Sequence, residues 1–342
     1  MSDFIRNRRY LMPAVFGPTR IPDRSEIPRV HTVSLSFETD PDALAALVPS
    51  AFRLVEPASV MVSRITYDGV DYIGGRSYSE TLIGANCIHE GDGETLRAPY
   101  MLVLWVSDAL PMISGREFMG HAKIMGEMTP IEESDGARAF SLTEYGAPLL
   151  EGRATDLVEL DGAALDKARA ATRRSDAFGW KVIQSAEGPM DAAYPVVNVM
   201  RWSYERIWSG RGELRLFTPD HAQAPTSSDV MAALAALPVL RMRRSFVGVG
   251  SVVIDRLGTR RLGTRASLSG PHGAGLRRRA AHLFRPGRPR SPARLGPASG
   301  GGGAAGAGLD AGDELRRVHG LLRRLRDLGL HRRAGQLSPR GA

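Results

Sequence analysis

Alternating polar and apolar residues mark extended segments in the first 256 residues of the chain. Over residues 32–37, Val33, Leu35 and Phe37 fall on one face and hydroxyl residues on the other. This alternation predicts a β-strand with one buried face. Four apolar runs predict further strands, at residues 60–62, 101–106, 195–200 and 246–254.

Helical signals are fewer than strand signals. Asp40-Pro41 is typical of a helix start, because Asp caps free N–H groups and Pro fits the first helical position. Residues 161–173 also have a helical composition, and Gly91-Asp92-Gly93 indicates a turn. Many strands and few helices predict an α+β fold that is mainly antiparallel β, arranged as a barrel or as packed sheets.

Composition divides the chain near residue 256. Residues 257–342 hold 18 Arg, no Lys, four acids and a single aromatic residue, with a low-complexity run at 300–308. The predicted organisation is therefore one folded domain at 1–256 and an Arg/Gly-rich tail at 257–342, which has too little apolar surface to fold alone.

Two explanations of the tail stay open. It is either a genuine disordered tail or the product of a GC-rich gene read out of frame. Its arginines would attract phosphates, but nucleic-acid binding is disfavoured because no aromatic residues are interleaved for base stacking. Residues 313–333 carry a basic amphipathic pattern that would suit an acidic partner or a membrane surface.

Other sequence features narrow the cellular setting. No apolar run approaches the ~20 residues of a membrane span, and the start of the chain lacks a secretory pattern. A single cysteine, Cys87, excludes an intramolecular disulfide. These features predict a cytoplasmic protein.

The scarcity of lysine gives the first chemical signal. Only Lys123, Lys167 and Lys181 occur among the 45 basic residues, and Lys123 lies in the apolar segment 118–125. Unlike arginine, a desolvated lysine can lose its proton and attack carbonyl groups to form a Schiff base. The alternative is a lysine whose stem packs while its ammonium reaches water.

Several other kinds of site are disfavoured. The glycine run lacks the Lys-Ser/Thr ending of a phosphate loop, and no Gly-x-Ser-x-Gly elbow occurs. The histidines have no zinc-site spacing, and Asp220-His221 is more typical of a turn than of a metal site. We therefore expect no metal.

Four motifs in order carry a resemblance to a known family. They are Thr39-Asp40-Pro41-Asp42-Ala43-Leu44 with the residues up to Pro49, Tyr78-Ser79-Glu80, Gly115-Arg116-Glu117-Phe118 with Lys123 eight residues after the glycine, and the segment from Leu214 to Pro225 containing Asp220-His221-Ala222. Together with Pro238-Val239, they make residues 27–256 resemble the acetoacetate decarboxylase family.

The resemblance implies a barrel-like core that encloses Lys123, a homo-oligomer and no cofactor. It implies a Schiff-base lyase acting on a small β-keto acid, with Lys123 as nucleophile and Glu80 as acid-base or orienting group. Tyr78 is a candidate pocket residue, and His121 is either a substrate ligand or a structural histidine. Arg116 is a candidate substrate ligand, with an ion pair to Glu117 as the alternative.

Two departures from the family pattern leave the reaction open. Ile124 stands where the decarboxylases have a second lysine, so Lys123 must rely on desolvation. Val30 matches the family's substrate-binding arginine, which makes the neighbouring Arg29 the candidate for carboxylate recognition. The alternatives are an imine-dependent aldolase-dehydratase and a non-catalytic ligand-binding relative.

Overall fold

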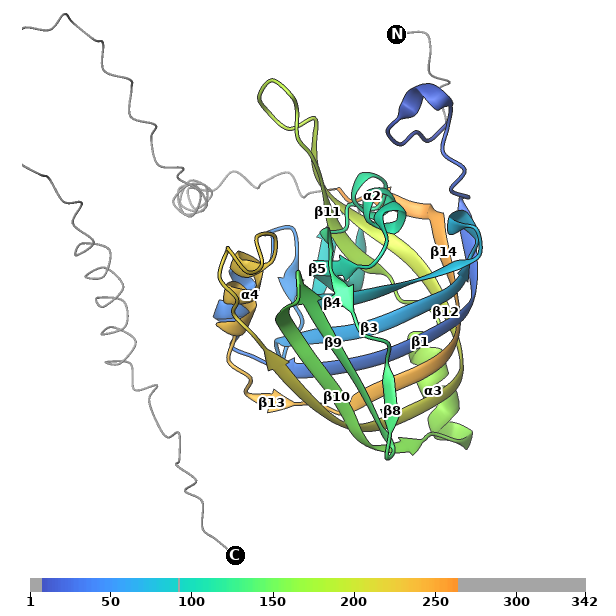
Figure 1. Cartoon of the computed structure of the whole chain (residues 1–342), viewed down its shortest axis with the longest axis vertical. Helices are drawn as coiled ribbons and strands as arrows, with labels where there is room; N and C mark the ends of the chain where they lie inside the picture. Colours follow the sequence, from blue (N-terminus) through green and yellow to red (C-terminus); the bar gives the residue numbers. More distant parts are fainter. Residues whose placement is uncertain (1–7, 92, 264–342) are drawn as a thin grey trace, which may run out of the picture. The chain divides into compact units, whose positions relative to one another are not determined.

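A 14-stranded sheet dominates the computed structural model, which describes residues 8–91 and 93–263 (Figure 1). The described strands are β1 (Arg24–Glu38), β2 (Arg53–Leu54), β3 (Ser59–Val70), β4 (Arg76–Gly91), β5 (Glu94–Val106), β6 (Lys123–Met125), β7 (Glu127–Met128), β8 (Glu132–Ser134), β9 (Ala137–Glu144), β10 (Ala147–Glu159), β11 (Ala177–Ile183), β12 (Ala192–Leu216), β13 (Arg241–Met242) and β14 (Ser245–Arg261). The helical elements are η1 (Ala14–Phe16), α1 (Pro41–Ala45), η2 (Asp71–Ile73), α2 (Ala109–Glu117), α3 (Gly162–Thr172) and α4 (Ser228–Ala235). The predicted α+β, mainly antiparallel class is confirmed.

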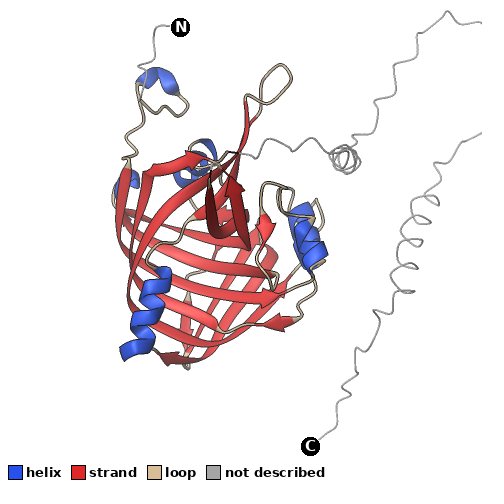
Figure 2. Cartoon of the chain, turned by 180° about the vertical axis from the view of Figure 1, so that it is seen from behind, coloured by secondary structure: helices blue, strands red, loops and turns tan. Residues whose placement is uncertain are grey.

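The sheet closes on itself. Its strand order runs β11-β5-β4-β3-β1-β14-β12, and β11 pairs with β12 again, so these seven strands form a ring. The 25-residue strand β12 makes this possible, because its first part pairs with β11 and its last part with β10. Seen from behind, the strands curve around a common interior (Figure 2). Closure pairs the backbone N–H and C=O groups that the edge strands of an open sheet would leave exposed.

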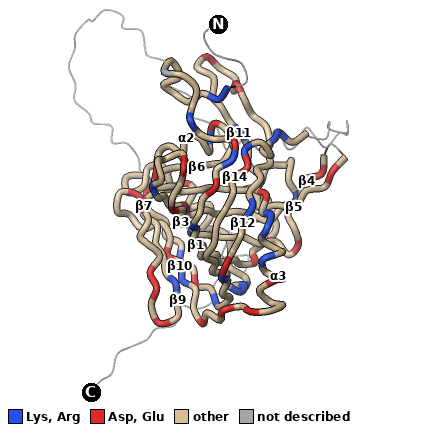
Figure 3. The backbone as a smooth tube through the Cα atoms, turned by 90° about the vertical axis from the view of Figure 1, so that its right-hand side faces the viewer, with Lys and Arg blue, Asp and Glu red and all other residues tan. Residues whose placement is uncertain are grey.

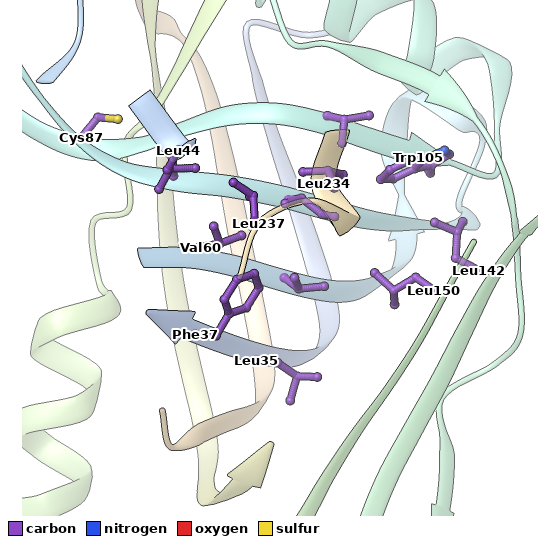
Figure 4. Close-up of a cluster of buried hydrophobic side chains, with 14 of the residues drawn as sticks. Leu35, Phe37, Leu44, Val60, Cys87, Trp105, Leu142, Leu150, Leu234 and Leu237 are labelled. Carbon is purple, nitrogen blue, oxygen red and sulfur yellow. The ribbon is translucent and has the colours of Figure 1, made fainter. Parts of the chain in front are cut away.

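Both faces of the central strands are buried, against two different apolar clusters. On one face, Leu35, Phe37 and Val60 pack with Leu234 and Leu237, from α4 and the residues that follow it (Figure 4). On the other face, a second cluster surrounds the interior of the ring. Period-2 alternation along each strand therefore sends neighbouring residues to different cores.

The hydroxyl residues of β1 lie on the interior face. Thr32 is buried there and hydrogen-bonds the hydroxyl of Tyr204 at 3.1 Å, while Ser34 hydrogen-bonds Ser63 at 2.7 Å. The alternation at 32–37 is thus confirmed as a strand, but its polar face lines an internal cavity. Asp40 caps α1 as predicted, accepting from the Ala43 N–H at 2.8 Å.

The folded unit continues past residue 256, where the sequence places its end. Strand β14 runs to Arg261, and Leu262 is buried in the first cluster. Charged residues of both signs are spread over this unit (Figure 3). Residues 264–342, including most of the predicted tail and its amphipathic segment, lie outside the described residues.

No helix within residues 8–91 and 93–263 is both long and apolar enough to span a membrane.

Candidate active site

Lys123 opens the short strand β6 and is buried, with 5% of its surface exposed. Strand β6 pairs with β5 in parallel, and the preceding helix α2 lies against the lysine stem. Gly120 makes the turn between helix and strand at φ 64°, where a Cβ would come within 2.8 Å of the Lys181 backbone. Arg116 in α2 donates to the Lys123 carbonyl at 3.0 Å and so helps to fix β6.

The ammonium of Lys123 forms an ion pair and hydrogen bond with Glu80 of β4. Glu80 is also buried and accepts a hydrogen bond from the Tyr67 hydroxyl at 3.3 Å. Tyr78 lies beneath the lysine, with Nζ 6.0 Å from the ring centroid, and stacks on Tyr67 at 4.7 Å. The structure therefore brings together four of the predicted residues, because His121 lies on the same cavity wall as Lys123, Glu80 and Tyr78.

The two stacked tyrosines remain neutral phenols. Burial raises the pKa of both Tyr67 and Tyr78 well above the ordinary value, and the nearby Glu80 carboxylate adds to the effect. Phenols that keep their protons can donate hydrogen bonds but cannot act as bases. Proton transfer next to Lys123 therefore depends on Glu80.

These side chains line a cavity of about 220 Å³ inside the ring of strands. Most of its wall is apolar, including Ile65, Met101 and Leu104. Apart from tyrosines, the titratable groups among its described lining residues are Glu80, Lys123, His121 and Arg256. A mostly apolar lining with a few convergent polar groups is typical of a small-molecule site.

His121 is held in one tautomer by its neighbours. The side-chain NH₂ of Asn198 donates both to the Met119 carbonyl and to His121 Nε2, each at 2.9 Å. The Met119 carbonyl can only accept, which fixes the amide orientation, and the Asn198 oxygen accepts from the Thr259 hydroxyl at 3.2 Å. Nε2 is therefore an acceptor, so the proton lies on Nδ1, a buried atom without a protein partner. Neutral His121 therefore keeps an N–H without a hydrogen-bond acceptor among the described residues.

Burial and the nearby Lys123 lower the pKa of His121 to about 3. Unfolded His121 takes up a proton near 6.5, so the unfolded state binds more protons between pH 6.5 and 3. As the pH falls through that window, we expect this group alone to reduce the free energy of unfolding by about 1.4 kcal/mol per pH unit. Urea unfolding at pH 7, 6 and 5 measures the slope. His121→Gln should lose this contribution, whereas substitution of the exposed His221 should retain it; equal slopes in all three proteins would contradict the assignment.

Gly115 provides the space that the lysine stem occupies. A Cβ at this position would lie 2.5 Å from Lys123 Cδ and 2.7 Å from Cε. We expect Gly115→Ala to displace the amine of Lys123. The kcat/KM of a reaction at this amine should then fall about 100-fold, because a misplacement of ~1 Å can have an effect of that size. The melting temperature should not fall, because alanine favours the helix by about 1 kcal/mol and the lysine is flexible. Glu117→Ala in the same helix is the control, and a fully active Gly115→Ala would refute the packing argument.

Two predicted ligands do not reach the cavity. Arg29 and Arg116 are both exposed, and neither lines it. Arg29 pairs across β1 and β3 with Asp68, next to a bulge, while its neighbour Val30 points to the interior. Arg116 instead holds the Lys123 carbonyl.

Sequence reasoning missed Tyr67, Asn198 and Arg256. Arg256 is the second cation among the described lining residues. The period-2 alternation of β14 could have predicted this position. Ile254 and Arg256 are two residues apart, so they lie on the same face of the strand, and both line the cavity.

The remaining candidates have structural roles or none. Asp220 makes a turn, accepting from the Gln223 N–H at 2.9 Å. No group of three or more potential metal ligands occurs within residues 8–91 and 93–263. Cys87 is buried, and burial raises the pKa of its thiol to about 12, so it is a poor nucleophile.

Comparisons with known proteins agree with this architecture. The sequence model described as acetoacetate decarboxylase (ADC) matches residues 11–257. The acetoacetate decarboxylase of Chromobacterium violaceum is 27% identical over 270 residues, covering 74% of this chain and 97% of the relative.

Solved structures show the same fold at lower identity. Acetoacetate decarboxylase from Legionella pneumophila superimposes with a TM-score of 0.58 at 18% identity, covering 73% of this chain and 90% of the other. The enduracididine biosynthesis enzyme MppR, complexed with the condensation product of pyruvate and imidazole 4-carboxaldehyde, gives 0.57 at 18% identity, covering 78% and 99%. Because the family model spans most of the chain, including Glu80 and Lys123, this protein belongs to the acetoacetate decarboxylase family.

Proposed function

We propose that this protein is a carbon–carbon lyase that decarboxylates a small β-keto acid through an imine on Lys123. The observation that carries the proposal is the buried Lys123–Glu80 pair in a largely apolar cavity. In such a pair a proton can pass from the ammonium to the carboxylate, leaving a free amine next to a carboxylic acid. That combination suits carbonyl attack followed by loss of water.

Imine formation uses both members of the pair. The Lys123 nitrogen attacks the ketone carbon, and the carbonyl oxygen becomes the hydroxyl of a carbinolamine. Glu80 then gives its proton to this hydroxyl, which leaves as water, and the nitrogen becomes a protonated imine.

The protonated imine then draws electrons from the bond to the carboxylate. This bond breaks, carbon dioxide leaves, and its electron pair forms the carbon–carbon double bond of an enamine. Protonation at carbon and hydrolysis release the ketone and restore Lys123. The apolar wall favours this step, because a carboxylate disperses its charge as it becomes carbon dioxide.

The absence of a second lysine is compatible with this chemistry. Ile124 packs with the cluster outside the ring, so a side chain at 124 lies on the opposite face of β6 from Lys123. An ammonium there would have a limited influence on the cavity side.

Aldol condensation with dehydration is the second candidate. The same enamine can attack an aldehyde in place of accepting a proton, and this route needs no loss of carbon dioxide. The fold likeness to MppR, whose solved complex holds a condensation product, favours it. The two candidates differ in what happens after the imine forms.

Borohydride trapping distinguishes them. The full chain is incubated with acetoacetate, or with pyruvate plus an aromatic aldehyde, and reduced; the adduct is then located by peptide mass spectrometry. An adduct on Lys123 that has lost carbon dioxide supports decarboxylation. An adduct that contains both pyruvate and the aldehyde, with the water of their condensation lost, supports the second candidate. A folded protein without any adduct on Lys123 would overturn imine catalysis and favour a ligand-binding relative.

A further inference from the structure

Arg256 is a buried cation for which the proposed reaction has no use. It is 4% exposed and lines the same cavity as Lys123. Nη1 donates to the Pro22 carbonyl at 2.9 Å and to Ser25 Oγ at 2.8 Å, and the guanidinium lies 5.0 Å from the Tyr72 ring centroid. Nε is buried and has no hydrogen-bond partner among the described residues. These contacts position the guanidinium but supply no negative charge.

A counter-ion for Arg256 is missing within residues 8–91 and 93–263. No carboxylate in these ranges forms an ion pair with it, and the exposed Asp71 acts on it only at longer range. Burial lowers the pKa of Arg256, yet a guanidinium keeps its proton near neutral pH. Because the Lys123–Glu80 pair is neutral overall and His121 is uncharged, the described lining carries one uncompensated positive charge. An anionic ligand would neutralise it.

A second buried arginine helps to separate a ligand site from simple burial. Arg64 is 1% exposed, and it also has no ion pair among the described residues. However, its two Nη atoms donate to the carbonyls of Ile65 and Thr129, and it does not line the cavity. Arg256 differs because it lines a space that a ligand can enter.

The position of Arg256 suits a carboxylate other than the one that would leave as carbon dioxide. Glu80, which holds Lys123, lies on β4, and Arg256 lies on β14, three strands away in the order β4-β3-β1-β14. At about 4.8 Å per strand, the backbones of these two strands are roughly 14 Å apart around the wall. Lys123 Nζ lies 6.0 Å from the ring centroid of Tyr78, and the Arg256 guanidinium lies 5.0 Å from that of Tyr72, which hydrogen-bonds Tyr78. Two adjacent tyrosines therefore link the surroundings of the two cations. The carboxylate of a β-keto acid is only two bonds from its ketone carbon.

We propose that Arg256 forms an anion-binding site separate from Lys123, and that the substrate is a 3-oxo acid with another carboxylate at the far end of its carbon chain. The inference rests on the proposed function for the reacting end of the substrate. Apolar residues between the two sites, among them Ile65, Leu104 and Ile254, suit a methylene chain. Binding energy from the distal carboxylate would hold the reactive one beside Lys123 without a cation to stabilise it, which favours its loss.

Occupation of the distal site can be measured without any reaction. Octanoate and octanamide have similar shapes but differ in charge, and neither forms an imine. By calorimetry on the full chain, we expect octanoate to bind at least 10-fold more tightly than octanamide. Arg256→Gln should remove the difference, Arg256→Lys should keep part of it, and Arg53→Gln, at an exposed arginine, should not change it. Equal affinities in the native protein would overturn the site.

Substrate preference tests the second part of the inference. Decarboxylation is compared for 3-oxohexanoate against 3-oxohexanedioate, and for 3-oxooctanoate against 3-oxooctanedioate. We expect the diacid to have a kcat/KM at least 30-fold higher for one pair, and Arg256→Gln to bring that ratio to about 1. A monoacid preference at both lengths would overturn the assignment of substrate class. If calorimetry finds the anion site but borohydride traps no adduct, the proposed function fails while the site stands.

Discussion

Lys123→Arg is expected to abolish borohydride trapping and to lower turnover at least 1,000-fold. A guanidinium keeps its proton, so it can retain the ion pair with Glu80 but cannot attack a carbonyl. Peptide mass spectrometry gives an unambiguous result, because the chain has only two other lysines, the exposed Lys167 and the partly buried Lys181. Replacing either of these by arginine should leave the adduct on Lys123 unchanged.

Amine rescue separates the nucleophile from a merely structural lysine. Lys123→Ala leaves room in the cavity for a small amine, and ethylamine can form the imine in place of the missing side chain. We expect ethylamine to restore part of the lost activity and triethylamine, which cannot form an imine, to restore none. Turnover in Lys123→Arg within 10-fold of the native protein, or an adduct that persists on another lysine, would refute the role of Lys123.

Local patterns predicted several elements well, although not α2 and β6, which flank Lys123. The Asp40-Pro41 signal specifies a helix start through a cap that is formed by neighbouring residues, and the structure contains that cap. The association of Lys123 with Glu80 followed from a resemblance of motifs, since 43 residues separate them along the chain. Spacing alone could not have paired them, because their contact depends on β6 adding to β5 beside β4.

Long-range geometry explains what the sequence could not predict. The return pairing of β11 with β12 closes the ring, and no local pattern encodes it. Closure also turns the polar face of β1, typical of a solvent-facing surface, toward an internal cavity. Arg29 and Val30 are adjacent in the strand and therefore face opposite sides of the sheet. Arg29, the residue expected to bind the substrate carboxylate, thus lies outside the cavity. Arg256 lines the cavity from β14, at the position where composition predicts the end of the domain.

Glu80→Gln should separate proton transfer from binding. The amide has nearly the shape of the carboxylate and can still hydrogen-bond Tyr67, but it can neither accept the proton of Lys123 nor return it to the carbinolamine. We expect kcat to fall roughly 100- to 10,000-fold, the usual contribution of a positioned general acid-base group. Trapping should become slow rather than absent, because imine formation loses its proton carrier while the nucleophile remains.

The same substitution should also lower stability, because it leaves a buried ammonium without its partner. Breaking a buried ion pair from one side costs about 3–5 kcal/mol, which urea unfolding would measure. Glu90→Gln is the matched control, since Glu90 lies on the same strand but forms its ion pair with Arg53 on the exposed surface, where such pairs contribute about 0–1 kcal/mol. Glu80→Asp keeps an acid and should retain more activity than Glu80→Gln. If the glutamine variant instead traps substrate as fast as the native protein, another group must carry the proton, and the neutral His121 on the same wall could not do so without charging at a pKa of about 3.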